Sequence, residues 1–112
     1  MKRQIFKKPQ AERDLIEHFA FIARDKLKPA IRFLRVASDT FEKLAVMPNM
    51  GRAWMSSDPR LAGIRAYVMP SPFRNYLIFY RFTDSALEIL TILHGARDLE
   101  AVLRAIEPRP TD

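Results

Sequence analysis

The segment that decides the fold is Tyr76-Leu77-Ile78-Phe79-Tyr80-Arg81-Phe82, a dense run of aromatic and β-branched residues. A second apolar run spans residues 87–93, and the polar triplet Thr83-Asp84-Ser85 separates the two runs. Aromatic and β-branched side chains favour strands, and a short polar segment between two such runs is typical of a hairpin. We therefore expect two adjacent antiparallel strands here.

The residues before this hairpin predict another strand at 64–69, joined to it by Pro70-Ser71-Pro72-Phe73. Residues 52–63 lack a regular apolar period and are interpreted as a loop. A weak alternation over residues 3–6 predicts a short N-terminal strand. After the hairpin, Asp98 would cap a short helix over residues 99–106.

Two helical patterns precede the strands. Apolar residues recur at helical spacing from Gln10 to Lys26, and again from Pro29 up to the stop signal at residues 47–51. Only a few residues around Leu27 and Lys28 join them, which favours an antiparallel helical hairpin. We expect an α+β fold: an N-terminal strand, a helical hairpin packed on one face of a mainly antiparallel sheet, and a short C-terminal helix. The other face should be at least partly exposed, with the strand arginines on it.

Length and composition place the chain among compact single domains. It has 112 residues, 48% of them hydrophobic, which is material for a packed core. We predict one domain over residues 1–107 and a flexible tail over residues 108–112. The chain contains no cysteine, so disulfides, thiolate metal sites and cysteine nucleophiles are excluded.

Several other function classes lack support in the sequence. No phosphate-binding loop, dinucleotide fingerprint or paired metal-ligand motif occurs, so we expect no cofactor and no metal. No apolar run approaches the roughly 20 residues that cross a bilayer, and the first residues lack the apolar segment of a signal peptide. A cytoplasmic protein is expected.

The excess of positive charge is unevenly placed. The chain carries 19 Lys and Arg against 13 Asp and Glu, a net charge of +6. In residues 51–112 every basic residue is an arginine, and residues 59–83 contain Arg60, Arg65, Arg74 and Arg81 without any carboxylate. Guanidinium groups suit carboxylates and phosphates. This stretch therefore predicts a surface that meets an anion, either an acidic protein segment or nucleic acid; a solvated face without a partner is the simpler interpretation.

A few single residues could carry chemistry or recognition. His94 closes the last predicted strand before Gly95, where it could exchange a proton during phosphodiester cleavage or only hydrogen-bond the turn. His18 is interpreted as a residue on the flank of the first helix. Trp54 could cap the edge of the core or anchor an interface. Alternation places Tyr76 on one strand face with Tyr80.

The same alternation puts Arg81 on the face shared by Leu77 and Phe79, which is awkward for an arginine that meets solvent. Either the strand carries a bulge, or Arg81 emerges at the strand end. The sequence leaves both alternatives open.

At this point the chain resembles the ParE toxins of the RelE/ParE superfamily, the toxic halves of bacterial type II toxin–antitoxin pairs. The resemblance covers most of the chain, and three elements carry it in this order: Pro48-Asn49-Met50-Gly51-Arg52, Tyr76-Leu77-Ile78-Phe79-Tyr80-Arg81, and His94-Gly95-Ala96-Arg97-Asp98. It implies a helical hairpin on a twisted antiparallel sheet. It also implies a toxin that inhibits DNA gyrase and is neutralised by a ParD-like antitoxin, whose acidic C-terminal segment folds as it binds. We expect the pair to form a hetero-oligomer; a short acidic protein with a ribbon-helix-helix-like start, encoded immediately upstream, would settle the class of the partner.

On this interpretation the protein is a binding toxin without catalytic residues. The residues expected to contact the target or the antitoxin are Arg65, Arg74, Arg81, Arg97, Trp54 and Tyr76. The alternative is a ribosome-dependent mRNA endoribonuclease of the RelE type, in which His94 is the acid or base and Arg97 and Arg65 clamp the phosphate. A third interpretation is a degenerate toxin that only binds antitoxin.

Overall fold

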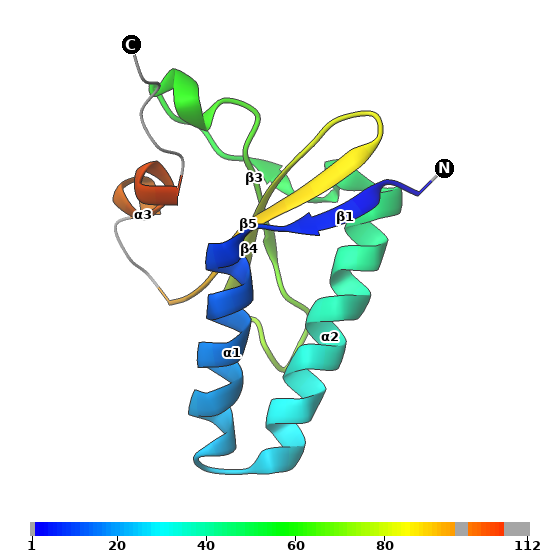
Figure 1. Ribbon diagram of the computed structural model, residues 1–112, viewed down its shortest axis with the longest axis vertical. Coiled ribbons are helices and arrows are strands. Elements are labelled where there is room, and N and C mark those ends of the chain that lie inside the picture. Colours follow the sequence, from blue (N-terminus) through cyan, green and yellow to red (C-terminus); the bar gives the residue numbers. More distant parts are fainter. Residues whose placement is uncertain (1, 96–98, 107–112) are drawn as a thin grey trace.

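A helical hairpin packs on one face of a mixed sheet. The computed structural model describes residues 2–95 and 99–106 (Figure 1). Its five strands lie in the order β1-β5-β4-β3-β2; β1 runs parallel to β5, and the other neighbours are antiparallel. The α+β fold class expected from the sequence is confirmed. The strands are β1 (Gln4–Lys7), β2 (Arg52–Ala53), β3 (Arg65–Val68), β4 (Tyr76–Phe82) and β5 (Ala86–His94).

The hairpin consists of α1 (Pro9–Ala23) and α2 (Leu27–Val46). Pro9 occupies the first turn of α1, where its missing N–H removes no helical hydrogen bond. We expected Pro29 to open α2, with the connection around Leu27 and Lys28, and this was wrong by two residues. The connection is residues 24–26, and Pro29 lies inside the first turn of α2, where its ring is still tolerated.

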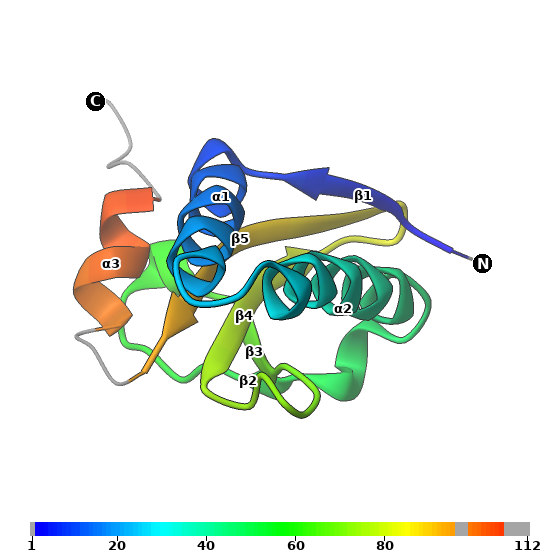
Figure 2. The same ribbon diagram turned by 90° about the horizontal axis from the view of Figure 1, so that it is seen from below.

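Two buried clusters lie on opposite faces of the sheet. The larger one fills the space between the hairpin and the sheet and includes Phe33, Phe41, Tyr76, Ile78 and Tyr80. The smaller one combines strand residues such as Phe79, Leu90 and Leu93 with Leu61 and with Leu103 of α3 (Leu99–Ile106). Figure 2 shows α3 on the side of α1, away from α2. The second face of the sheet is therefore partly covered. The arginines that were expected on this face lie on both faces of the sheet.

The segment expected to be a loop contains local structure. A short 3₁₀ turn occurs at Pro59–Leu61, and another, Pro48–Met50, lies just before this segment; each has a proline at its start. Strand β2 has two residues and pairs with the beginning of β3. A two-residue strand offers no period that sequence inspection can detect, which explains why it was missed.

The structure decides between the two alternatives for Arg81: the bulge lies in β5 and not in β4, so Arg81 stays on the face of Leu77 and Phe79, one residue before the end of β4. Phe79 lies opposite Thr91 and Tyr80 lies opposite Ile89, so Leu90 is an extra residue in β5. The alternation of β4 itself stays intact: Tyr76 and Tyr80 share the helix-facing cluster, as expected. No helix among the described residues is long and apolar enough to cross a membrane. The predicted cap Asp98 and the predicted tail 108–112 lie outside the described residues.

Candidate functional site

The residues expected to form a binding surface do not lie on one surface. Cross-strand partners share a face of the sheet, and Arg65 lies opposite Tyr80, whose side chain belongs to the helix-facing cluster. Arg81 follows Tyr80 on β4 and so projects from the opposite face. Arg97 lies outside the described residues. The fold therefore does not place these guanidinium groups together on one outward-facing surface.

Arg65 holds the backbone that follows α2. Its Nε donates a hydrogen bond to the carbonyl oxygen of Gly51 at 2.9 Å, and its Nη2 lies 3.4 Å from the carbonyl oxygen of Asn49. The side chain is partly buried in this position. Arg65 was expected to contact a partner, but its guanidinium donors bind backbone carbonyls of the connection between α2 and the sheet.

The hydroxyl of Tyr80 completes this connection. It donates to the carbonyl oxygen of Pro48 at 2.6 Å and accepts from the N–H of Gly51 at 2.9 Å. A Cβ on Gly51 would lie 2.3 Å from the Tyr80 hydroxyl oxygen, so only glycine fits. Burial raises the pKa of Tyr80 above its ordinary 10.0. The Pro-x-x-Gly element is thus explained by packing around one buried hydroxyl.

Three other arginines form ion pairs with two carboxylates of the chain itself. Arg81 Nη2 lies 3.0 Å from Glu88 Oε1, directly opposite it on β5. Arg60 Nη2 lies 2.7 Å from Asp58 Oδ2, and Arg104 Nε of α3 donates to the same oxygen at 3.1 Å. Hydrogen bonds from Arg60 hold the pKa of Asp58 well below its usual range. The expectation that Arg81 is displayed for a partner is therefore corrected.

Arg74 remains exposed, and it shares a groove with a residue that the sequence analysis did not select. Arg74 and Arg52 both line a groove of about 350 Å³ along β3, together with Tyr67 and Val68. Neither arginine forms an ion pair with a carboxylate of the described residues. Arg52 was missed because the short strand that places it beside Arg74 gives no signal in the sequence.

Trp54 lies at the edge of the smaller cluster and also reaches the surface of the molecule. Its ring packs edge to face against Phe79 at a centroid distance of 5.5 Å, and its indole N–H is buried without a hydrogen-bond acceptor among the described residues. It lines a largely apolar cavity of about 420 Å³ with Met55 and Val68. Met55 is 85% exposed, so this cavity opens to solvent.

Tyr76 is a core residue rather than a surface anchor, which corrects the sequence-based expectation. Only 6% of it is exposed, and burial raises its pKa above the ordinary 10.0. Its ring packs against Phe33 at 4.8 Å, His18 at 4.9 Å and His94 at 4.6 Å between centroids. Its place opposite the end of β5 makes it part of the packing beneath His94.

The alternative catalytic set is not assembled by the described residues. His94 is exposed and lies opposite Tyr76, whereas Arg65 lies opposite Tyr80 on the other side of β4. Four residue steps along β4 correspond to about 13 Å at roughly 3.3 Å per residue. This separation is too large for one phosphate to contact both side chains. Arg97, the third member, lies outside the described residues.

Asp14 and His18 of α1, which the sequence analysis did not select as site residues, bind the hairpin to the sheet through hydrogen bonds. Asp14 is buried, and its carboxylate accepts from the Thr91 hydroxyl and, at 3.0 Å, from the N–H of Ile92. Gln10 donates to it at 2.8 Å. His18 Nε2 lies 2.7 Å from the carbonyl oxygen of Ile92, which identifies Nε2 as the donor.

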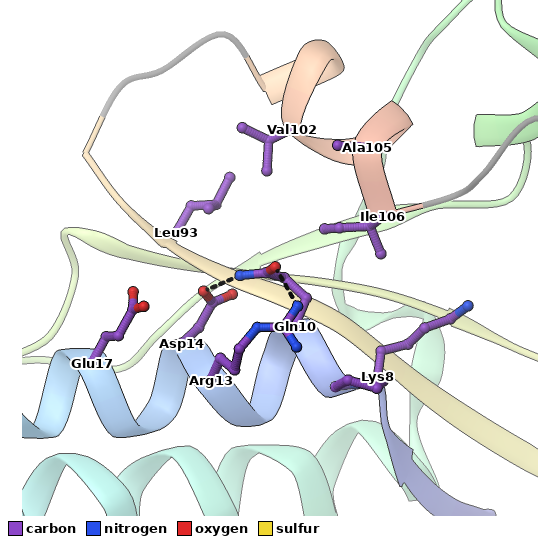
Figure 3. Close-up of a pocket in the computed structure, with 10 residues that line it drawn as sticks. Lys8, Gln10, Arg13, Asp14, Glu17, Leu93, Val102, Ala105 and Ile106 are labelled. Carbon is purple, nitrogen blue, oxygen red and sulfur yellow. Dashed lines mark hydrogen bonds between the residues drawn. The ribbon is translucent and has the colours of Figure 1, made fainter.

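Asp14 also lies at the floor of a cavity of about 450 Å³ between α1, β5 and α3. Figure 3 shows Gln10 bridging Asp14 and Arg13 on one wall, and Leu93, Val102 and Ile106 on the other. Arg13 donates to Gln10 at 2.9 Å. No cluster of metal-ligating side chains occurs among the described residues. In this cavity Gln10, Arg13 and Asp14 are hydrogen-bonded to each other.

Two solved structures with a similar fold belong to toxin–antitoxin systems. A chain of the chromosomal ParDE system from P. aeruginosa superposes with a TM-score of 0.66 at 16% identity, covering 85% of this chain and 98% of that one. A chain of the RelBE2 complex from Mycobacterium tuberculosis gives a TM-score of 0.55 at 20% identity, covering 84% and 99%. At these identities the likeness establishes the fold alone.

The sequence match is more specific. The family described as ParE toxin of type II toxin–antitoxin system, parDE, matches residues 5–99. The chain therefore belongs to the ParE toxin family, and the resemblance drawn from the sequence is confirmed. No curated protein matches the chain significantly.

Proposed function

We propose that this toxin inhibits DNA gyrase in the bacterial cytoplasm and that a ParD-like antitoxin with an acidic segment neutralises it. The observation that carries the proposal is the family match over residues 5–99, which spans α1, α2, strands β2 to β5 and most of β1. The positive charge of the chain supports a negatively charged partner.

The geometry favours recognition through Arg52 and Arg74 within this proposal. Their guanidinium groups are exposed beside Tyr67 in the groove along β3, whereas Arg81 is paired with Glu88 and Arg65 with backbone carbonyls. Exposed guanidinium groups beside an aromatic ring suit a carboxylate-bearing protein surface. We therefore assign target contact to Arg52 and Arg74, with Trp54 as the neighbouring apolar anchor.

The test is a gyrase supercoiling assay with relaxed plasmid. We expect the purified toxin to block supercoiling or to accumulate cleaved DNA, and the antitoxin to restore activity. Arg52→Ala combined with Arg74→Ala should weaken inhibition at least tenfold, because two charge-assisted contacts are lost. A matched control, Lys7→Ala with Lys43→Ala, removes the same charge elsewhere and should leave inhibition unchanged. Full supercoiling at a large molar excess of folded toxin would contradict the proposal.

Ribosome-dependent mRNA cleavage is the second candidate, and the exposed imidazole of His94 favours it. In that case transcripts are cut on translating ribosomes, and His94→Ala abolishes cutting while antitoxin affinity stays nearly intact. The two assays separate the candidates, because gyrase inhibition does not require a proton transfer at His94.

A further inference from the structure

The face of the sheet opposite the helical hairpin has a hollow beside strand β2. Its floor is formed by Ala66 and Val68 of β3 and by Leu77 and Phe79 of β4. These residues pair across the two strands, Ala66 with Phe79 and Val68 with Leu77, so their side chains project from the same face. Because the side chain of Ala66 is a single methyl group, this position leaves the floor hollow next to Phe79. The hollow is the cavity of about 420 Å³ that Trp54 lines.

Trp54 and Met55 form the wall of this cavity at the edge of the sheet. The backbone N–H of Trp54 donates to the carbonyl oxygen of Ile64 at 2.8 Å, which holds the wall against the neighbouring chain segment. Met55 in the wall is 85% exposed, and Val68 on the floor is 43% exposed. The described chain therefore leaves apolar surface uncovered around a concave site, which is typical of a ligand-binding cavity.

A cation lies at the rim of this apolar cavity. Arg52 lies directly opposite Ala66 in the pairing of β2 with β3, so its side chain projects from the face that contains the cavity. Arg52 is exposed and pairs with no carboxylate among the described residues, and none of the described residues that line the cavity is acidic. An apolar lining with one guanidinium group matches a molecule that has an apolar body and one negative charge.

The indole N–H of Trp54 is a second donor in the wall. It is buried without an acceptor among the described residues, so the ring is positioned by its packing against Phe79 and not by a hydrogen bond. A buried donor without an acceptor is unfavourable, and such groups are rare in folded proteins. A carboxylate in the cavity would bring two acceptor oxygens to a wall whose side-chain hydrogen-bonding groups, those of Arg52 and Trp54, are donors.

The size and charge of the cavity narrow the class of ligand. Sites for small molecules usually enclose about 300–1,000 Å³, with a mostly apolar lining and few polar groups. The cavity volume of about 420 Å³ lies in that range. A phosphate monoester carries about two negative charges near pH 7 and is typically held by several cations or backbone N–H groups. This lining offers one guanidinium group, so a monocarboxylate with an alkyl or aryl body fits it better.

We propose that the cavity between Trp54, Met55, Ala66 and Phe79 binds a small apolar monocarboxylate, such as a medium-chain fatty acid, with Arg52 as its counter-ion. The apolar body lies on the floor formed by β3 and β4, and the carboxylate meets the guanidinium group at the rim. This inference goes beyond the proposed function and does not depend on it. Arg52 also lines the groove along β3, so the ligand would engage a guanidinium group that is assigned to target contact.

Tryptophan fluorescence gives a direct test, because Trp54 is the only tryptophan of the chain. Titration of the purified chain with decanoate, kept below the concentration at which it forms micelles, should change the emission in a saturable way. Isothermal titration calorimetry should give a stoichiometry of one. Octanoate should bind roughly tenfold more weakly, because two fewer methylene groups are buried. Acetate, which has the charge without the apolar body, should leave the emission unchanged.

Two substitutions test the charge and the cavity separately. Arg52→Gln should weaken decanoate binding roughly fivefold, because an exposed ion pair is lost. Arg74→Gln is its matched control, since it removes the same charge from the neighbouring groove without touching the cavity lining, and it should leave binding unchanged. Ala66→Leu fills the floor and should abolish measurable binding, with an unchanged circular dichroism spectrum. Ala20→Leu adds the same side chain on the exposed surface of α1 and should have no effect.

Each outcome supports or overturns the inference. An equal loss in Arg52→Gln and Arg74→Gln would show that decanoate responds only to the net positive charge, and full binding by a folded Ala66→Leu chain would place the ligand elsewhere; either result overturns it. A dimer of the parent chain that Ala66→Leu dissociates would assign the cavity to a second copy and overturn it as well. If Ala66→Leu does not fold, the two arginine variants and the comparison of decanoate with octanoate decide the inference.

Discussion

At the scale of single residues, the buried side chain of Tyr80 holds the connection between α2 and the sheet in place. Its hydroxyl links the carbonyl of Pro48 to the N–H of Gly51, and its ring occupies the space that a side chain at position 51 would need. Arg65 binds the same segment from the neighbouring strand. The Pro-x-x-Gly element therefore has a structural role: it fixes the connection from α2 into the sheet.

Tyr80→Phe should lower the free energy of unfolding by about 1–3 kcal/mol, because a buried N–H and a buried carbonyl lose their partner. Gly51→Ala should cost about 1–3 kcal/mol through overpacking against the same ring. Urea unfolding of both variants measures these losses. Tyr67→Phe on the adjacent strand is the control, since its hydroxyl has no hydrogen-bond partner among the described residues. An equal loss in that control would contradict the assigned role of the Tyr80 hydroxyl.

At the scale of elements, the contact between α1 and β5 combines packing with a polar fastening. Asp14 and His18 lie one turn apart on α1, and both bond to the backbone of Ile92. The bulge at Leu90 lies next to this point and sets which residues of β5 face the helix. The hairpin is therefore held in one register relative to the sheet, which also fixes the direction in which α2 presents its outer side.

A double-mutant cycle on Asp14 and Thr91 measures this fastening. Asp14→Asn should lower the free energy of unfolding by about 1–3 kcal/mol. The NH₂ group of asparagine would face hydrogen-bond donors where the carboxylate oxygen of Asp14 now accepts their hydrogen bonds. Combined with Thr91→Val, the two losses should be non-additive by about 0.5–3 kcal/mol, as expected for side chains in direct contact. The exposed Asp39→Asn variant should stay within about 0.5 kcal/mol of the parent. Strict additivity would show that the two groups do not interact in solution.

At the scale of the whole molecule, the charge excess is distributed rather than concentrated. Arg60 and Arg81 are paired internally, while exposed cations remain in the groove along β3 and on α2. A net charge of +6 favours encounter with negatively charged molecules in general, wherever on the surface they bind.

The stability of the whole domain should fall in alkaline solution. Burial raises the pKa values of Tyr76 and Tyr80 above 10.0, so the folded state holds both phenolic protons more tightly than the unfolded state. Their contribution is present below pH 10 and is lost as the pH rises through the raised values. The midpoint of urea unfolding should decrease above pH 10, and less steeply in Tyr80→Phe. Ionisation of both tyrosines at pH 10 in the folded protein, followed by tyrosinate absorbance, would contradict this.

The helical hairpin, the N-terminal strand, the three longer strands after the hairpin, the short C-terminal helix and the family could all be predicted from the amino-acid sequence; strand β2 could not. These features depend on local periods and on the residues at turns, which act over a few positions and can be read along the chain. The expected placement of Tyr76 and Tyr80 on one face followed from the same local rule and is confirmed. The resemblance carried by three short elements was confirmed by the match over residues 5–99.

The tertiary structure alone decided which charges stay available. Glu88 reaches Arg81 across a strand pair, Arg104 reaches Asp58 from a distant helix, and Arg52 joins Arg74 only through a two-residue strand. The neutralisation of a cation depends on what the fold brings within a few ångströms of it, and the Coulomb energy falls with that distance rather than with separation along the chain. A carboxylate-free stretch of sequence therefore does not predict a carboxylate-free surface.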